Sequence, residues 1–267
     1  MKTIITGLII MTSLSFHAHS QDWDGKGKKS TYEFQIKGNA ADTWLIIENL
    51  ASELRIEGTS ASVIKIETNN YKGLPEKAKG LKPLSSSGPE NTGVGLHIKQ
   101  DGNTITLASA HNEANDADYV LYLPKNLKLK IDYNSWQAED VLIKGMAGEI
   151  EAKSQVGDLK FVNVTGPLVA HTLSSDLEVI FTSLSSTSPT SLSSTSGDID
   201  VTIPANTKGT FKMATVSGGV YTAFDFDFGD QKLNRIGGQS ATGKLNGGGV
   251  EVLLKSVSGD VYVRKPE

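Results

Sequence analysis

Acidic residues recur at a regular spacing in the middle of the chain. Asp140, Glu149, Asp158 and Asp176 lie at multiples of nine residues from one another, and apolar residues spaced two apart follow each of them. A column of carboxylates could bind Ca²⁺, and a pair of them could hydrolyse a glycosidic bond. An acid in a turn also accepts hydrogen bonds from backbone N–H groups. This structural role is the preferred interpretation of the four acids.

A second acidic run, 225–230 (DFDFGD), places three carboxylates within six residues. An EF-hand loop would need Gly at its sixth position and Glu at its twelfth, and neither is present. The interleaved Phe residues favour a half-buried strand over a calcium loop.

Histidine offers no site either. After residue 20 the chain has only His97, His111 and His171, which are scattered and share no metal-ligand spacing. We expect all three at the surface or at strand edges. No nucleophile elbow or phosphate-binding loop is present. The sequence therefore predicts no catalytic, cofactor-binding or metal-binding residues, no cofactor and no enzyme activity.

The elements that carry these residues are predicted to be short β-strands, because apolar and polar residues alternate along most of the chain. Segment 69–93 breaks the alternation with three Pro and four Gly, so we expect a long excursion that is mobile or functional. The N-terminal strands could cap one end of the fold. Strands are expected within 31–68 and over 94–98, 104–107, 119–123 and 127–131.

From residue 140 the pattern becomes a repeat. Steps begin at residues 140, 149, 158, 167 and 176; four of the five open with an acid, and three follow a Gly. Each step places two apolar residues on one strand face, which predicts a β-solenoid that turns at Gly-Asp. Gly is expected to supply a positive φ there, and Asp to bond its own turn backbone. Similar steps follow at residues 197, 218, 248 and 258.

The stretch 182–200 (TSLSSTSPTSLSSTSGDID) contains the unit TSLSSTS twice, at 182–188 and 190–196. It could be a flexible serine linker or part of the solenoid. Leu184 and Leu192 lie eight residues apart, close to the repeat length, and Thr favours strands. We interpret both copies as solenoid, with a tandem duplication as their origin.

Three segments carry a resemblance to a known family. They are LSSTSGDIDVTIPANTKGTFKMATVSGGV, the closing SVSGDVYVRKP, and LIIENLASELRIEG, in which Ser52-Glu53 replaces the usual Gly-Asp. Over roughly 40–265 the chain resembles the bacterial putative-adhesin family of β-strand-repeat proteins, a domain of unknown function. The resemblance implies an extracytoplasmic β-solenoid or β-roll and a role in adhesion, and it supplies no catalytic or binding residues.

Composition narrows the function classes. The net charge of −4 argues against a nucleic-acid partner, and the absence of cysteine excludes disulfides, thiol catalysis and cysteine-bound zinc. A signal peptide cleaved after residue 20 is predicted from the positive charge of Lys2, the apolar run 4–16 and the cleavage pattern Ala18-His19-Ser20. The alternative, an uncleaved anchor, is disfavoured because the run is short for a membrane span.

These observations predict an all-β, single-chain β-solenoid (β-helix or β-roll) with less regular N-terminal strands; the alternative is a β-sandwich plus a solenoid. The predicted divisions are a signal peptide over 1–20, a mobile lead-in over 21–30 and an adhesin-like β-repeat domain over 31–267, with a possible sub-boundary near 125.

We expect an exported, extracytoplasmic binding protein or adhesin, in the periplasm, at the cell surface or secreted, with a glycan or protein partner at the cell envelope and no membrane span after cleavage. The alternatives are a periplasmic scaffold or partner in an envelope stress system and a polysaccharide-active β-helix enzyme. The aromatic residues that could stack on sugars are Tyr119, Tyr122, Tyr133, Trp136, Tyr221 and Tyr262.

Overall fold

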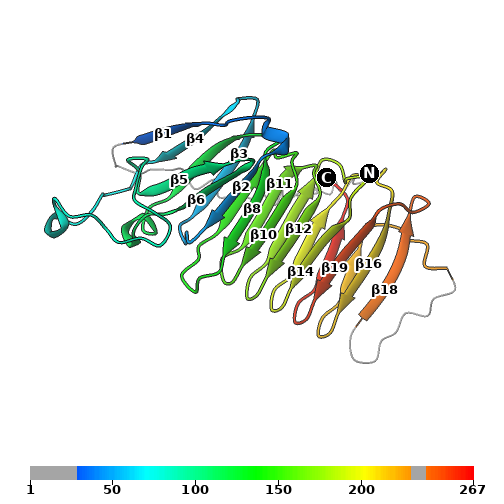
Figure 1. The fold of residues 1–267 in the computed structure, drawn as a ribbon. Coiled ribbons are helices and arrows are strands. Elements are labelled where there is room, and N and C mark those ends of the chain that lie inside the picture. The colour runs from blue at the N-terminus through cyan, green and yellow to red at the C-terminus, as the bar shows by residue number, and fades with distance from the viewer. Residues whose placement is uncertain (1–28, 230–238) are drawn as a thin grey trace, which may run out of the picture.

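The computed structural model describes residues 29–229 and 239–267, and their strands form two long sheets that face each other (Figure 1). The predicted signal peptide over 1–20 lies outside the described residues, as does the lead-in up to residue 28. Ser30 already belongs to the first strand, so the lead-in ends earlier than predicted. In the described part, no helix is long and apolar enough to cross a membrane.

Each sheet has ten strands. In spatial order, sheet 1 contains β1 (Ser30–Gln35), β4 (Val63–Thr68), β7 (Tyr119–Pro124), β3 (Leu54–Thr59), β9 (Val141–Lys144), β11 (Leu159–Val164), β13 (Leu177–Phe181), β15 (Ile199–Thr202), β20 (Val261–Arg264) and β17 (Val220–Thr222). Sheet 2 contains β18 (Gln239–Leu245), β16 (Gly209–Thr215), β19 (Glu251–Ser256), β14 (Thr190–Ser194), β12 (Leu168–Thr172), β10 (Ile150–Ser154), β8 (Lys128–Tyr133), β2 (Trp44–Glu48), β6 (Thr104–Ser109) and β5 (Leu96–Asp101). Three short 3₁₀ helices lie between strands, η1 (Ala40–Asp42), η2 (Glu76–Ala78) and η3 (Asn112–Ala114).

Successive nine-residue steps fall in alternate sheets, so one full coil takes two steps. Val141, Leu159 and Leu177 are register partners in the parallel strands β9, β11 and β13. The predicted all-β solenoid is confirmed. Strand β3 pairs with β9 and β2 pairs with β8, so pairing continues across residue 125. Antiparallel pairs β1–β4, β4–β7 and β5–β6 make the N-terminal end less regular, as predicted.

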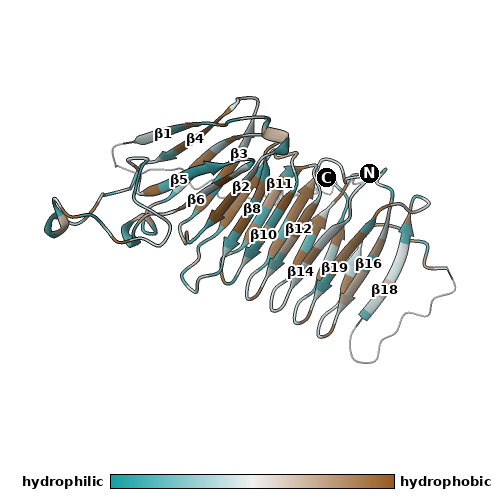
Figure 2. Cartoon of the chain, viewed as in Figure 1, coloured by the Kyte–Doolittle hydropathy of each residue, from teal (hydrophilic) through white to brown (hydrophobic). Residues whose placement is uncertain are grey.

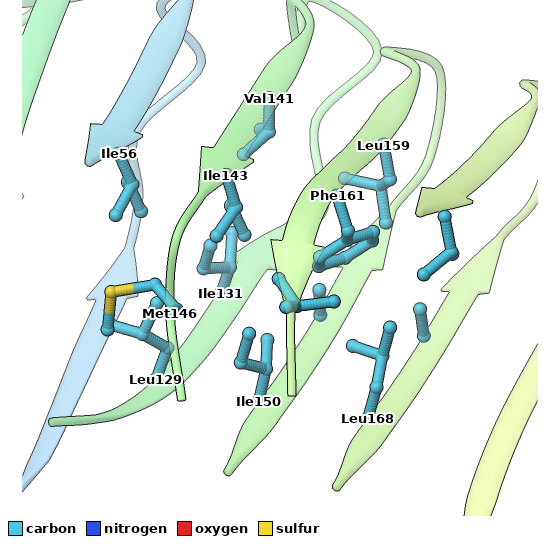
Figure 3. Close-up of a cluster of buried hydrophobic side chains, with 14 of the residues drawn as sticks. Ile56, Leu129, Ile131, Val141, Ile143, Met146, Ile150, Leu159, Phe161 and Leu168 are labelled. Carbon is cyan, nitrogen blue, oxygen red and sulfur yellow. The ribbon is translucent and has the colours of Figure 1, made fainter. Parts of the chain in front are cut away.

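The core lies between the two sheets. Alternate residues of each strand point inward, and Figure 2 shows hydrophobic and hydrophilic segments alternating along the strands. In the close-up of Figure 3, Ile131 of β8 lies beside Ile143 of β9, and Leu129 of β8 lies beside Met146. All four side chains are fully or almost fully buried. The period-two pattern therefore predicted the buried face correctly.

The coils at both ends are inserted between other coils, which the sequence did not predict. Strand β20 pairs with β15 on one side and with β17 on the other. Its companion β19 lies between β14 and β16, as Figure 1 shows. At the other end, β3 lies between β7 and β9, and β2 lies between β6 and β8. Coil order in space therefore differs from coil order in the sequence.

The two copies of TSLSSTS have different structures. The second copy forms β14, with Thr190, Leu192 and Ser194 facing inward. The first copy, 182–188, is a loop between β13 and β14, in which Ser185 Oγ accepts hydrogen bonds from the N–H groups of Thr187 (3.3 Å) and Ser188 (3.1 Å). The prediction that both copies belong to solenoid strands is wrong for the first copy, which adds length at a corner where β9 connects to β10 through five residues and β11 to β12 through three.

Glycines in the turns that lead from sheet 2 into sheet 1, here called corner 1, allow successive coils to stack closely. A Cβ on Gly157, Gly197 or Gly259 would lie 2.0, 2.1 or 2.2 Å from a carbonyl oxygen of the neighbouring coil. None of the three has a positive φ. The expectation that they supply a positive φ is therefore wrong. Glycine is needed at these positions because the backbone of the neighbouring coil leaves no room for a Cβ atom.

Buried hydroxyl groups complete corner 1. Ser154 Oγ donates to the Gly157 carbonyl (2.6 Å), and Thr172 Oγ1 donates to the Ser175 carbonyl (2.8 Å). Ser256 Oγ donates to the Gly197 carbonyl of the neighbouring coil (3.0 Å). These contacts satisfy carbonyl groups that the sheets leave unpaired at the turn. The recurring pattern of Ser or Thr, then Gly-Asp, is thus a backbone requirement.

Candidate functional site

The turn aspartates form one continuous ladder along corner 1. The Oδ1 atom of Asp140 accepts a hydrogen bond from the backbone N–H of Asp158 in the next coil (2.9 Å). The same contact links Asp158 to Asp176, Asp176 to Asp198, and Asp198 to Asp260, at 2.7 to 2.9 Å. Each aspartate therefore bonds the next coil's backbone and not its own turn, which corrects the local hydrogen bond predicted from the sequence.

Glu149 does not join this ladder. It lies where the chain enters sheet 2, at the opposite corner, and its Oε2 is 3.5 Å from Lys128 Nζ. Successive nine-residue steps alternate between corners, so only every second acid can stack. A four-membered acid column over Asp140, Glu149, Asp158 and Asp176 does not exist.

Three carboxylates meet at the N-terminal end of the ladder. Glu53 and Asp118 occupy the ladder position before β3 and β7, and Glu139 precedes Asp140. One oxygen of each of Glu53, Asp118 and Glu139 lies within 4.8 Å of the others. Such oxygen donors suit a hard divalent cation, although Ca²⁺ takes six to eight ligands. The repeat spacing did not predict this cluster, although Glu53 and Asp118, like Asp140, each precede two apolar residues spaced two apart.

Burial is the main cause of a raised pKa at each of these carboxyl groups. For Glu53, repulsion by Asp118, Glu139 and Asp140 raises the pKa further. Asp118 also has a raised pKa, although a hydrogen bond from Asn70 opposes the shift. The pKa of Glu139 is raised by burial and by Asp118. The cluster therefore holds protons more tightly than free carboxyl groups do.

His111 lies in a buried network at the N-terminal end. Its side chain is 3% exposed, and its Nε2 is 2.8 Å from the Tyr71 hydroxyl. Its Nδ1 is 3.1 Å from Glu113 Oε2. The prediction of a surface position is wrong for His111, because segment 69–93 contributes Tyr71 over it. Burial, with the nearby Glu90 and Glu113, raises the pKa of Tyr71 to about 12, so this hydroxyl stays protonated.

The run 225–230 closes the C-terminal end of the core. Phe224 and Phe226 are buried, and the Phe226 ring meets the Phe211 ring edge to face with centroids 5.2 Å apart. Asp225 and Asp227 are exposed, and Asp227 Oδ1 accepts the N–H of Gly229 (2.9 Å). Buried and exposed residues alternate over 224–228 as predicted, but the predicted strand is reduced to one isolated bridge between Asp227 and Lys244, and Asp230 lies outside the described residues.

The aromatic candidates divide into buried and exposed groups. Tyr119 and Tyr133 are fully buried, and their hydroxyls donate to the carbonyls of Val94 (2.8 Å) and Ser52 (3.1 Å). They cannot stack on a sugar, because the period-two pattern places them in the core. Trp136 is 76% exposed in the loop after β8.

Tyr221 and Tyr262 form an aromatic surface at the C-terminal end of sheet 1, here called the tyrosine platform. Their rings stack with centroids 5.3 Å apart and an interplanar angle of 16°. Tyr221 is 54% exposed. Tyr262 donates to Asp260 Oδ2 (2.9 Å), a bond that raises the pKa of Tyr262 to about 12. The Arg264 guanidinium lies 5.0 Å from the Tyr262 ring centroid and is fixed by two 2.8 Å bonds to Asp200.

A family model and several solved structures match the chain. The model, described as Toastrack DUF4097, matches residues 47–264. The chain is similar to a crystal structure named a putative cell adhesion protein from Clostridium sporogenes, with 11% identity over 90% of this chain and 100% of that chain and a TM-score of 0.43. A putative adhesin from Bacteroides fragilis shows 12% identity over 91% and 99%, with a TM-score of 0.40.

A third similar structure is named a putative lipid binding protein from Parabacteroides distasonis, with 11% identity over 91% of this chain and 98% of that chain and a TM-score of 0.32. No curated protein matches the chain. At such identities and TM-scores, these likenesses carry no argument about function.

Replacing Asp198 by Ala is expected to lower the free energy of unfolding by about 1–2 kcal/mol, because the backbone N–H of Asp260 then loses its acceptor. Asp198→Asn keeps an acceptor and should lose less. Urea unfolding followed by circular dichroism measures both. Asp225→Ala, an exposed acid off the ladder, is the control. Full stability of Asp198→Ala would contradict the structural role of the ladder.

The acid cluster is expected to make stability depend on pH. A carboxyl group whose pKa is raised on folding destabilises the folded state when it ionises. The free energy of unfolding therefore falls as the pH rises from 4.5, the ordinary pKa of Glu, through the raised pKa of the folded state. Glu53→Gln should therefore raise the free energy of unfolding at pH 7.5 by roughly 0.5–1 kcal/mol and change it little near pH 4. Urea unfolding from pH 4 to 8 measures this, with exposed Glu76→Gln as the control. Parallel pH profiles for the two variants would contradict the expectation.

Proposed function

The chain belongs to the Toastrack DUF4097 family, and from this premise we propose that it is an exported, non-enzymatic binding protein, of the adhesin type, that contacts a glycan at the cell envelope. Its tyrosine platform is the contact surface in this proposal. The family is a domain of unknown function, so the proposal rests on the chain's own residues.

The observation that carries the proposal is the stacked pair formed by Tyr221, which is exposed, and Tyr262, which is half-buried. Aromatic rings offer large, rigid contact area at a low cost in conformational entropy. The pair lies on the outer side of a sheet whose inner side is packed in the core, so its position is fixed by strand pairing between β17 and β20. Arg264 and Asp200, held against each other beside the rings, add hydrogen-bonding groups at the edge of the platform.

Export is supported by the N-terminal sequence, in which a positive start, the apolar run 4–16 and Ala18-His19-Ser20 follow the order of a signal peptide. The absence of cysteine fits a chain that needs no disulfide in an oxidising compartment. The alternative of a periplasmic scaffold or stress-system partner shares this export step and differs in the partner.

The alternative of a polysaccharide-active enzyme has one supporting observation, the cluster of Glu53, Asp118 and Glu139. A catalytic site of this kind would need an Arg or Lys side chain beside the acids. Arg55 instead pairs with Glu57 (2.7 Å), and Arg264 pairs with Asp200 at the far end of sheet 1. Arg235 lies outside the described residues. The binding proposal is therefore preferred.

Tyr221→Ala is expected to weaken binding to a glycan roughly 3- to 10-fold, because one stacked aromatic contact contributes about 0.5–1.5 kcal/mol. A glycan array identifies the ligand, and titration calorimetry on the wild type and the variant measures the affinity. Tyr122→Ala, a half-buried tyrosine of β7 at the other end of sheet 1, is the matched control. An array with no bound glycan, or equal affinity of Tyr221→Ala, would contradict the proposal.

Protease treatment of intact cells is expected to remove the protein from the cell surface, or fractionation should find it in the medium. Immunoblots of whole cells, periplasm and medium measure the distribution. Protection in intact cells, with release only after the outer membrane is opened, would overturn the adhesin role and favour the periplasmic alternative. Retention of residues 1–20 in the mature chain would overturn the predicted cleavage.

A further inference from the structure

Four outward-facing side chains line up across adjacent strands on the outer face of sheet 2. Lys153 of β10 is the register partner of His171 in β12, His171 is the partner of Ser193 in β14, and Ser193 is the partner of Lys255 in β19. Lys153, His171 and Lys255 are exposed, and Ser193 is half-buried. These four residues, here called the cationic row, run across the strands.

The two lysines of the cationic row differ from three other lysines of this face, which lie beside glutamates. Nζ of Lys128 lies 3.5 Å from Glu149, that of Lys130 lies 3.1 Å from Glu151, and that of Lys212 lies 2.6 Å from Glu251. In the described part of the chain, no carboxylate lies within 4.0 Å of Lys153 or Lys255. The register neighbours of Lys255 are the uncharged Ser193 and Ala214.

Two acids lie beyond the N-terminal end of the row. Asp132 of β8 is the register partner of Lys153 on the side away from His171, and Glu48 follows in β2. These two acids bound the row at its N-terminal end. From Lys153 to Lys255, the row itself contains no carboxylate.

The middle of the row is arranged to donate hydrogen bonds. His171 Nδ1 lies 2.9 Å from Ser193 Oγ. When the hydroxyl donates to Nδ1, the proton of the neutral ring lies on Nε2, so the ring presents a donor. The surface is slightly hollowed beside Lys153, Val169 and His171, and the hollow is also lined by Lys130, Asp132 and Glu151. An anionic group over the His171–Ser193 part of the row would find the ring N–H on a line between the strands that carry Lys153 and Lys255.

We propose that the cationic row binds a linear anionic polysaccharide that lies across the strands of sheet 2. Neighbouring strands are about 4.8 Å apart, so the row spans roughly 14 Å and matches an extended chain with several anionic groups. The chain has a net charge of −4, so attraction to a polyanion requires a local group of positive charges such as this row. The inference rests on the proposed binding function but uses the other sheet, so the two can fail separately.

The test uses heparin, a linear sulfated polysaccharide, as the probe. Titration calorimetry at low salt is expected to show binding that weakens as salt is raised. Lys153→Gln/Lys255→Gln should reduce the affinity roughly 3- to 30-fold, since each exposed charge contact contributes about 0.2–1 kcal/mol. Lys99→Gln/Lys125→Gln, which makes the same charge change away from the row, should leave the affinity within twofold.

Three outcomes would overturn the inference. They are equal losses in the two double variants, no heparin binding by the wild type at low salt, and binding to anionic lipid vesicles in place of heparin, which would assign the row to a membrane surface. Tyr221→Ala should leave heparin binding unchanged. Loss of heparin binding in Tyr221→Ala would show that the row is not an independent site.

Discussion

The stacking distance of successive coils at corner 1 is the constraint on which the rest of the structure depends. The coils approach so closely that a single Cβ on Gly197 would reach a carbonyl oxygen of the neighbouring coil at 2.1 Å. This approach brings the Asp198 carboxylate within 2.7 Å of the next coil's backbone N–H. The same approach allows Ser256 to reach a carbonyl across the coils. Strand pairing in both sheets continues from this spacing, because corner 1 lies between the end of each regular strand of sheet 2 and the start of the next strand of sheet 1.

Much of the fold could be predicted from local sequence, because a strand's inward face has a period of two and the corners have a fixed chemistry. Leu159 and Phe161, two residues apart, are both buried as their spacing indicates. Local pattern could not separate the two copies of TSLSSTS, since identical residues form a loop at 182–188 and a strand at 190–194. What separates them is the position of the neighbouring strands, which a short window of sequence does not contain.

The candidate sites were predicted less well, because they are made by neighbours distant in sequence. Glu53 and Asp118 meet only because β3 lies beside β7. Tyr221 meets Tyr262 only because β20 lies beside β17. The ladder acids were identified from their spacing, but their partners in the next coil were not. Since core and corners are occupied by packing and backbone contacts, residues free to bind a ligand are those on the two outer faces, where substitution affects folding least.

The insertion of both end coils limits how such a protein can change in length during evolution. In a simple solenoid, a new repeat can be added at either end. Here β2–β3 and β19–β20 each fit between two other coils, so deleting either of them would remove a strand partner from the coils on both sides. Only the regular coils between them, from β10 to β14, can be duplicated without disturbing an insertion. The repeated TSLSSTS unit, which leads into β14, lies in this central region, where a growing chain has room for a new copy.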